Sequence, residues 1–411
     1  MKKVCTSHTF QQIYLIWSYK EMAVPFSIMC FSWNAAGLRL CETMSQAKAD
    51  AARTGFKAFI MRKKPCLAPD FFEEIRSAIN ARRPSLVVMI TQDEDESDTH
   101  FYADLLPSSM PEIGYSLLKR EKLDGVGEAA SGISQIRAPT GKPSGSALRT
   151  SIYARTEIIP SLRAEEKLMP GFFEHDAATC IQGDRVSGAI AIYVWHPTYG
   201  KFVFISTHLP SGVTALKVGK GLDYASYRVA SRSTNSLCLL RMYNQFVASL
   251  APESRPDHVF LLGDLNYDIV IPGKKNIEVV SELAANVTAA KFKDLQKYDE
   301  LKKAMEEVPL AGFKEGVSAE GPLFMPTWRM ARGRPDTCVP DSKTTKIEVS
   351  CFGEPNEALG GLGWHDRILY REMMTSNYMA HCMEYNRIDV RNMHASTHAG
   401  VLDTFEMRSV T

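Results

Sequence analysis

The stretch His258-Val-Phe-Leu-Leu-Gly-Asp-Leu-Asn-Tyr-Asp268 joins a short apolar run to a cluster of polar residues. Residues 259–262 have the length and composition of a buried β-strand, and Gly263 interrupts that run. Asp264 and Asn266 stand two positions apart, so an extended backbone places both side chains on one face. Such a pair can orient a water molecule and accept its proton. Taken alone, it is more simply an Asx turn that caps the strand.

Three other apolar runs of strand length also end in polar residues. The runs are 27–33, 86–91 and 202–207, and they lead to Asn34, to Gln92-Asp93 and to His208. Open sheets bind ligands at the ends of their strands, so these residues are candidates for one site. Each has a simpler interpretation: a turn for Asn34, a solvated acidic loop after Gln92, and a structural histidine for His208.

Helical patterns lie between the predicted strands. A stripe of apolar residues predicts a helix over 290–307, and a second candidate helix covers 231–250. Strands that alternate with helices indicate an α/β or α+β sandwich. The segments 124–147 and 331–363 are rich in loop-forming residues, and we interpret them as insertions at the rim of a single domain.

The composition limits the kind of protein. The chain has 411 residues, of which 45% are hydrophobic and 23% charged, with a formal net charge of +1. This balance gives no reason to expect nucleic acid as a partner. Nine cysteines without a CxxC pair argue against a disulfide framework and a structural zinc site, which favours a reducing compartment. We find no signal peptide and no apolar run long enough to span a membrane, so we predict a cytoplasmic protein.

Two motifs near the C-terminus add a carboxylate and a second histidine. Trp364-His-Asp-Arg-Ile-Leu369 contains Asp366, and Ser396-Thr-His-Ala-Gly400 contains His398. An Asp beside a His can fix the imidazole tautomer. The sequence alone does not show whether the two side chains touch.

Taken in order, these motifs resemble those of the magnesium-dependent endonuclease/exonuclease/phosphatase superfamily and, within it, the inositol polyphosphate 5-phosphatases. The segments that carry the resemblance are Trp33-Asn34, Thr91-Gln92-Asp93, Thr207-His208-Leu209, Gly263-Asp264-Leu265-Asn266-Tyr267, Pro326-Thr327-Trp328-Arg329, Trp364 to Leu369 and Ser396-Thr397-His398. The Gly-Asp-Leu-Asn-Tyr and Trp-x-Asp-Arg-Ile-Leu runs point to the 5-phosphatases in particular. The resemblance implies a four-layer α/β (α+β) sandwich, in which helices flank two packed mixed β-sheets. It covers one catalytic domain over 25–408, after an N-terminal extension, 1–24, of unknown role.

The resemblance also implies roles for individual residues. Asn34 and Asp93 would hold Mg²⁺, and Asp264 and Asn266 would place and deprotonate the attacking water. His208 and His398 would hold the phosphoryl oxygens, and Asp366 would orient His398. Substrate would meet Arg329, Arg367 and Thr327. The implied activity is hydrolysis of a phosphate monoester on an inositol polyphosphate or a phosphoinositide, with peripheral membrane contact made through loops. The sequence gives no oligomeric state.

Three positions depart from the family pattern. Asp93 stands where the family has Glu, Thr397 replaces an acid, and Leu362-Gly363 replace a basic pair found in members that act on lipids with a neighbouring 4-phosphate. Two alternatives therefore stay open. One is phosphodiester cleavage, as in the nucleases and sphingomyelinases of the superfamily. The other is a catalytically weak protein that binds phosphoinositides without turnover.

Overall fold

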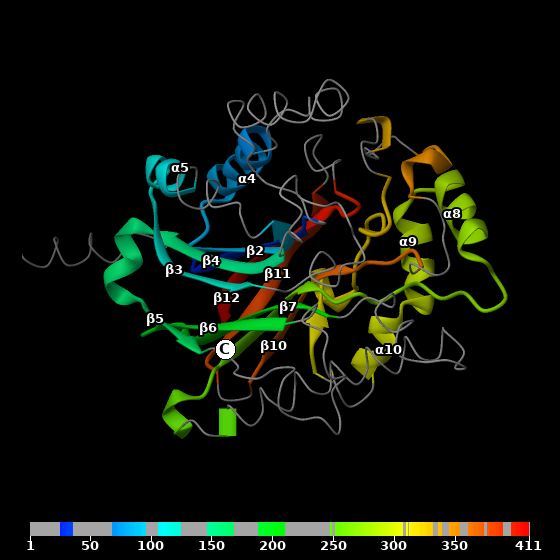
Figure 1. The fold of residues 1–411 in the computed structure, drawn as a ribbon. Coiled ribbons are helices and arrows are strands. Elements are labelled where there is room, and N and C mark those ends of the chain that lie inside the picture. The colour runs from blue at the N-terminus through cyan, green and yellow to red at the C-terminus, as the bar shows by residue number, and fades with distance from the viewer. Residues whose placement is uncertain are drawn as a thin grey trace, which may run out of the picture.

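In a computed structural model of the chain, the apolar runs form strands of two packed β-sheets (Figure 1). The structure describes residues 25–35, 68–95, 106–124, 146–167, 188–209, 247–248, 251–306, 310, 312–331, 336–338, 345–353, 361–373, 376–388 and 396–410. Each sheet contains six strands within these ranges. The predicted extension 1–24 and nearly all of the predicted helix 231–250 lie outside the described residues.

Sheet A has the strand order β11-β12-β1-β2-β4-β3. Its strands are β1 (Ser27–Asn34), β2 (Leu86–Asp95), β3 (Tyr115–Asp124), β4 (Ser146–Arg155), β11 (Tyr378–Ile388) and β12 (Gly400–Ser409). Strands β1 and β2 are parallel, whereas the other neighbours are antiparallel. The carboxyl ends of β1 and β2, which carry Asn34 and Gln92, therefore meet at one edge.

Sheet B has the strand order β5-β6-β7-β8-β10-β9. Its strands are β5 (Arg163–Lys167), β6 (Gly188–His196), β7 (Gly200–His208), β8 (His258–Asp264), β9 (Lys314–Glu315) and β10 (Asp366–Glu372). Again one central pair, β7 and β8, is parallel, and it brings His208 beside Asp264. The antiparallel strand β10 begins at the same place, because Asp366 pairs with Asp264.

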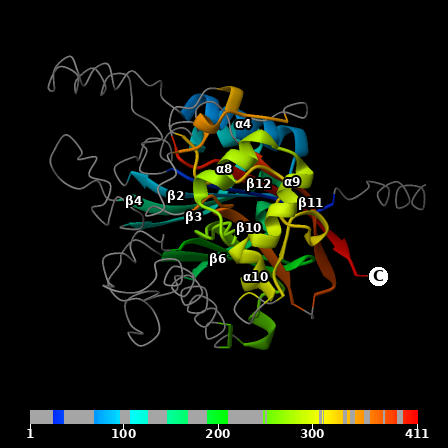
Figure 2. The same cartoon turned by 90° about the vertical axis from the view of Figure 1, so that its right-hand side faces the viewer.

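Helices α4 (Ala68–Arg82) and α5 (Leu106–Glu112) lie over the outer face of sheet A (Figure 1 and Figure 2). Helices α8 (Asn276–Ala285), α9 (Ala289–Leu295) and α10 (Glu300–Glu306) lie at one end of the two sheets. Ile75 and Ile79 of α4 pack in one buried cluster with Phe31 of sheet A, while Leu301 of α10 packs with Leu261 of sheet B. The order helix, sheet, sheet, helix confirms the predicted four-layer sandwich with two mixed sheets.

The central core lies between the two sheets and decides where the polar residues point. Side chains alternate between the faces of a strand, so every second residue enters this core. The inward residues of the central strands are Ile28, Cys30, Val88, Ile90, Phe202, Phe204, Phe260, Leu262, Ile368 and Tyr370, all in one buried cluster. Continued toward the strand ends, the same alternation reaches Asn34, Gln92, His208, Asp264 and Asp366, all buried. The polar cluster is thus the end of the apolar core.

The predicted helix over 290–307 was wrong as a single element. Helix α9 ends at Leu295, a 3₁₀ turn spans Gln296–Tyr298, and α10 starts at Glu300. Asp299 breaks the helix with an extended backbone, and its Oδ1 accepts a hydrogen bond from the N–H of Leu301, 3.1 Å away. An Asp side chain that caps a helix in this way competes with continuation of the helix through it.

The cysteine prediction was also wrong, because Cys338 and Cys351 form a disulfide in the predicted loop 331–363. The described part of that loop contains 3₁₀ turns at Asp336–Cys338 and Val349–Cys351. The inference of a reducing compartment, and with it of a cytoplasmic location, loses this support. The predicted loop 124–147 overlaps the neighbouring strands at both ends, since β3 extends to Asp124 and β4 starts at Ser146.

Strand β12 places Asp403 in the core between the sheets, fully buried, where it accepts a hydrogen bond from Cys382 Sγ at 3.1 Å. Burial raises the pKa of Asp403 well above its ordinary value, and the carboxylates of Glu315 and Glu384 act in the same direction. At low pH both folded and unfolded chains keep the proton. Above about pH 4 the unfolded chain releases it while the folded chain retains it, so stability falls as pH rises.

We therefore expect Asp403→Asn to stabilise the protein, and to do so increasingly from pH 4 to pH 7. The variant gains up to about 1.4 kcal/mol in unfolding free energy per pH unit over the wild type, because one proton is no longer linked to unfolding. Urea unfolding of both proteins across this pH range measures the difference. A difference that stays constant with pH would contradict the buried neutral carboxyl.

Candidate active site

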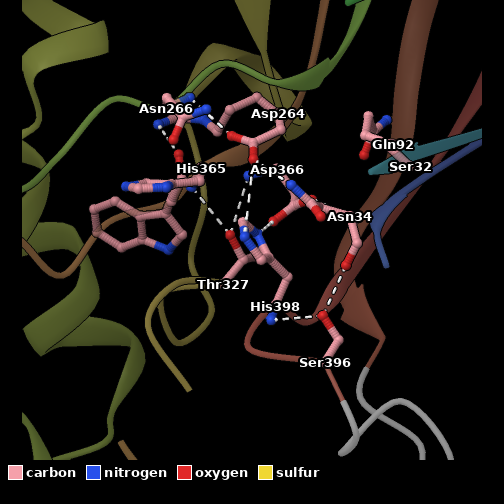
Figure 3. Close-up of polar contacts among 12 residues, drawn as sticks. Ser32, Asn34, Gln92, Asp264, Asn266, Thr327, His365, Asp366, Ser396 and His398 are labelled. Atoms are coloured by element: carbon pink, nitrogen blue, oxygen red, sulfur yellow. Dashed lines mark hydrogen bonds and ion pairs between the residues drawn. The ribbon is translucent and has the colours of Figure 1, made fainter. Parts of the chain in front are cut away.

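Side chains from both sheets meet at the polar end of the core (Figure 3). Asn34 Nδ2 donates a hydrogen bond to Asp264 Oδ2 at 2.7 Å, and the Asn34 backbone N–H donates to Asp366 Oδ1 at 3.1 Å. Asp366 Oδ2 in turn lies 2.8 Å from Nδ1 of His398. One residue of sheet A thus connects two carboxylates of sheet B, so the packing of the sheets fixes the arrangement.

Asp264 is at the centre of this network and is almost fully buried. Its Oδ1 accepts the backbone N–H of Asn266 at 3.0 Å, and its Oδ2 lies 3.5 Å from His208 Nε2 and 3.8 Å from His398 Nε2. Burial raises the pKa of Asp264 to about 7, with His398 opposing and Asp366 adding to the rise. A carboxyl in this state can accept a proton from a water molecule near neutral pH.

His398 is held from two sides. An ionised carboxylate only accepts hydrogen bonds, so the short contact with Asp366 places a proton on Nδ1 of His398. The His398 backbone N–H donates to Ser396 Oγ at 3.0 Å, and Ser396 Oγ donates to the carbonyl of Asn34 at 2.8 Å. Nε2 therefore faces Asp264 from a fixed ring, as in other Asp-oriented histidines.

His208 approaches Asp264 from the neighbouring strand and is also buried. Burial, and secondarily the nearby His398, lowers the pKa of His208 to about 3, so its imidazole is neutral. The close approach of β7 and β8 needs Gly263, whose φ is +140°. A Cβ at this position would stand 1.8 Å from the Thr207 carbonyl oxygen and force the strands apart.

Asn266 takes a left-handed backbone conformation with φ of 55° directly after the strand. Its Nδ2 donates to the carbonyl of Leu209 at 2.6 Å, which orients the amide and leaves Oδ1 as the acceptor for a water molecule. The Asx turn considered from the sequence is present too, because Asp264 accepts the Asn266 N–H. The structural and the chemical interpretations of this pair are compatible.

Oxygen donors for a metal come from the end of sheet A. Asn34 and Gln92 are paired in register on β1 and β2, and Gln92 Nε2 donates to Ser32 Oγ at 3.0 Å. Gln92 Oε1 is buried and has no hydrogen-bond partner among the described residues. Amide oxygens of this kind fit a hard cation such as Mg²⁺. The described residues hold no group of three His, Cys, Asp or Glu that could bind a metal, and the Asp93 side chain lies outside them.

Two of the predicted substrate-binding residues have other roles. Thr327 is fully buried, and its Oγ1 accepts the N–H groups of His365 and Asp366 at 3.0 and 3.1 Å. Arg367 follows Asp366 by one position, so it points to the opposite face of β10. There its guanidinium pairs with Glu315 and Asp299 and is 1% exposed. Both side chains are thus engaged within the protein, and a contact of either with substrate stays a prediction.

Arg329, the third predicted substrate-binding residue, lies against the ring of its chain neighbour Trp328. Its guanidinium carbon is 5.8 Å from the centroid of the Trp328 ring, and that ring is 4.4 Å from the ring of His398. The segment is held by pairing with residues next to the disulfide, since Gly353 N–H donates to the Arg329 carbonyl and Ala331 N–H to the Cys351 carbonyl. A phosphate contact by Arg329 stays a prediction.

The structure adds residues to which the sequence assigned no role. Ser396 links His398 to Asn34, and its place in the quoted Ser-Thr-His motif was the available signal. Gln92 was quoted only as the neighbour of Asp93. The members of a second Asp–His pair, Asp268 and His365, stand 97 positions apart in the chain, so no local pattern could reveal it.

Comparison with known proteins shows which family the chain belongs to. Residues 146–403 match the sequence model of the Endonuclease/Exonuclease/phosphatase family 2. A curated relative, phosphatidylinositol 3,4,5-trisphosphate 5-phosphatase 1 of Xenopus laevis, is 26% identical over 211 residues, which cover 50% of this chain and 17% of the relative. The chain therefore spans only a small part of that protein's length.

Solved structures show similarity over nearly the whole chain. A point mutant of Cimex nitrophorin, in its ferrous NO complex, is 15% identical with a TM-score of 0.51, covering 93% of this chain and 98% of the nitrophorin. The inositol polyphosphate 5-phosphatase domain of SPsynaptojanin, in complex with inositol (1,4)-bisphosphate and calcium, is 17% identical with a TM-score of 0.49, covering 97% and 91%. At these identities the nitrophorin likeness concerns the fold alone. The matched family covers more than half of the chain, so the protein belongs to the endonuclease/exonuclease/phosphatase family.

Proposed function

We propose that this protein is a magnesium-dependent phosphatase that removes a phosphate from an inositol polyphosphate or a phosphoinositide. The observation that carries the proposal is the convergence of Asp264 with the Asp366–His398 pair across Asn34. This arrangement combines a buried proton acceptor with an oriented imidazole, two groups that can catalyse hydrolysis of a phosphate ester. The curated relative supports the inositol-phosphate class through the activity in its name.

The chain's own residues account for most of the reaction. Asp264 takes the proton of the attacking water, which Asn266 Oδ1 helps to hold. His208 Nε2 and His398 Nε2 both face Asp264, and each ring can donate to a phosphoryl oxygen when its Nε2 carries a proton. Asn34 and Gln92 would hold Mg²⁺, together with the carboxylate predicted from the sequence, Asp93, whose side chain lies outside the described residues. When bound, the cation neutralises charge on the phosphoryl group.

Arg329 is our candidate for contact with a second phosphate of the substrate. It lies next to the ring cluster formed by Trp328 and His398, and its fork of donors suits a phosphate. A substrate that carries more than one phosphate would thus contact both the histidines and this guanidinium. Peripheral contact with a membrane is a further part of the proposal. Among the described residues, no helix is both long and apolar enough to cross a bilayer.

Phosphate release tests the proposal directly. Soluble inositol polyphosphates and phosphoinositide vesicles are incubated with the full chain in Mg²⁺ and, in parallel, with the metal removed by EDTA. We expect release that depends on Mg²⁺ from at least one of the two substrate forms. Failure to release phosphate from either form would refute the phosphatase. Cleavage of nucleic acid or sphingomyelin instead would move the protein to a phosphodiesterase branch of the family.

A further inference from the structure

A second Asp–His pair lies behind the site. Asp268 Oδ1 and His365 Nε2 are 2.8 Å apart, and the two side chains are 1% and 4% exposed. The carboxylate only accepts, so the contact assigns the proton of His365 to Nε2. Asp268 is itself fixed, because its N–H donates to Glu300 Oε2 and its carbonyl accepts the N–H of Glu300. The imidazole of His365 is therefore locked in one orientation.

The backbone around His365 is shaped to admit this ring. A Cβ on Gly363 would stand 2.7 and 2.9 Å from the imidazole atoms Cδ2 and Nε2 of His365, and 2.4 Å from the carbonyl oxygen of Tyr267. The His365 N–H donates to Thr327 Oγ1, and its carbonyl accepts the N–H of Leu265. Asp268 already engages Nε2 of the ring, so we expect any effect of His365 on catalysis to pass through a neighbour.

That neighbour is Trp328. Its ring stacks on His365 with a centroid separation of 5.4 Å and an interplanar angle of 21°, and it also contacts His398 at 4.4 Å. The centroids of His365 and His398 are 6.1 Å apart, so the three rings form a closed triangle. The indole N–H of Trp328 has no hydrogen-bond partner among the described residues. Ring packing, instead of a polar anchor, therefore sets the plane of the indole.

We propose that Asp268 and His365 are positioning residues for His398. Asp268 fixes the ring of His365, and His365 fixes the plane of the Trp328 indole. Trp328 in turn packs against the imidazole of His398, which Asp366 holds at Nδ1. The catalytic histidine is thus oriented twice, directly by one carboxylate and through two rings by another. This inference rests on the proposed function, in which His398 contacts the phosphoryl group.

Two substitutions at Asp268 test the proposal in the full-length protein. Asp268→Ala removes the acceptor and frees His365, and we expect kcat to fall about 10- to 100-fold while KM changes little, as for other outer partners of a functional histidine. Asp268→Asn keeps an oxygen acceptor of the same shape, so it should restore most of kcat. In a His398→Ala background, Asp268→Ala should cause no further loss, because the effect passes through that ring.

Ser376→Ala is the matched control. It removes the hydroxyl 3.2 Å from Nε2 of His258, a buried histidine at the opposite end of β8, and should leave kcat unchanged. If Asp268→Ala lowers kcat no more than this control, or lowers kcat further in the His398→Ala background, the positioning role is refuted.

A readout without turnover separates this proposal from the proposed function. The imidazole ¹H–¹⁵N signals of His398 should shift in Asp268→Ala and should stay in place in Ser376→Ala. This result is expected even if the wild-type protein releases no phosphate, in which case the proposed function fails and the orientation of His398 is still supported. Unchanged His398 signals in Asp268→Ala overturn the inference.

Discussion

Asp264→Asn is expected to reduce kcat for phosphate release by about 10²- to 10⁴-fold, the usual contribution of a positioned proton acceptor. Asparagine retains the shape of the side chain, and its oxygen can still accept the hydrogen bond that Asn34 Nδ2 now donates to Asp264 at 2.7 Å. It cannot take a proton from water. We therefore expect KM to change little while kcat collapses, measured by initial rates of phosphate release at saturating Mg²⁺.

Asp257→Asn provides the matched control for this experiment. Asp257 lies just before the opposite end of β8, where its carboxylate accepts the N–H of Lys201 at 2.9 Å, far from the cluster around Asp264. Its substitution should leave kcat within about twofold of the wild type, since it touches none of the reacting groups. An Asp264→Asn variant that kept more than about a tenth of the wild-type kcat would exclude Asp264 as the proton acceptor.

Arg367→Met is expected to lower the free energy of unfolding by about 3–5 kcal/mol, the typical cost of breaking a buried ion pair from one side. The substitution leaves two buried carboxylates, Glu315 and Asp299, without the cation that lies 2.5 Å from Glu315 Oε1 and 2.9 Å from Asp299 Oδ2. Urea unfolding measures the loss. Replacing both carboxylates by amides in the Arg367→Met background should recover part of it, because the uncompensated charges are then gone.

The more exposed ion pair Arg82–Glu384 serves as the control, because its two side chains contact each other with a similar geometry. Arg82 contacts Glu384 through two nitrogens at 2.5 Å each, but the two side chains are 31% and 29% exposed. Arg82→Met should therefore cost no more than about 1 kcal/mol. If Arg367→Met unfolded as the wild type does and instead raised KM, Arg367 would be a substrate-binding residue after all, as the sequence suggested.

The strands and the polar residues at their ends could be predicted from the sequence because both follow from local patterns. A strand can be recognised from its apolar run alone. The polar residue two positions beyond the last inward apolar side chain can then be identified without knowing which strand lies beside it. This is why Asn34, His208 and Asp264 were found and why they lie together. Whether His398 contacts Asp366 depended on the return of β12 to β1, which no local pattern encodes.

The parts that sequence patterns missed depend on residues far apart in the chain. Arg367 looked like a phosphate ligand because the charges that neutralise it, Asp299 and Glu315, belong to distant segments. The same ion pair explains the broken helix, since Asp299 both caps α10 and accepts from Arg367. The disulfide escaped prediction because cysteine spacing alone does not show which two thiols can approach.

The same strands carry the apolar core and the polar residues of the site, so insertions and deletions within these strands should not be tolerated. Phe260, Leu262 and Asp264 occupy successive inward positions of β8, so deletion or insertion of one codon between them would place the apolar side chain and the proposed catalytic side chain on opposite faces of the strand. The same holds for Ile368 and Asp366 in β10. Length variation should therefore be tolerated in the connections between strands and eliminated within the central strands, as a library of single-codon deletions scored for folded protein would reveal.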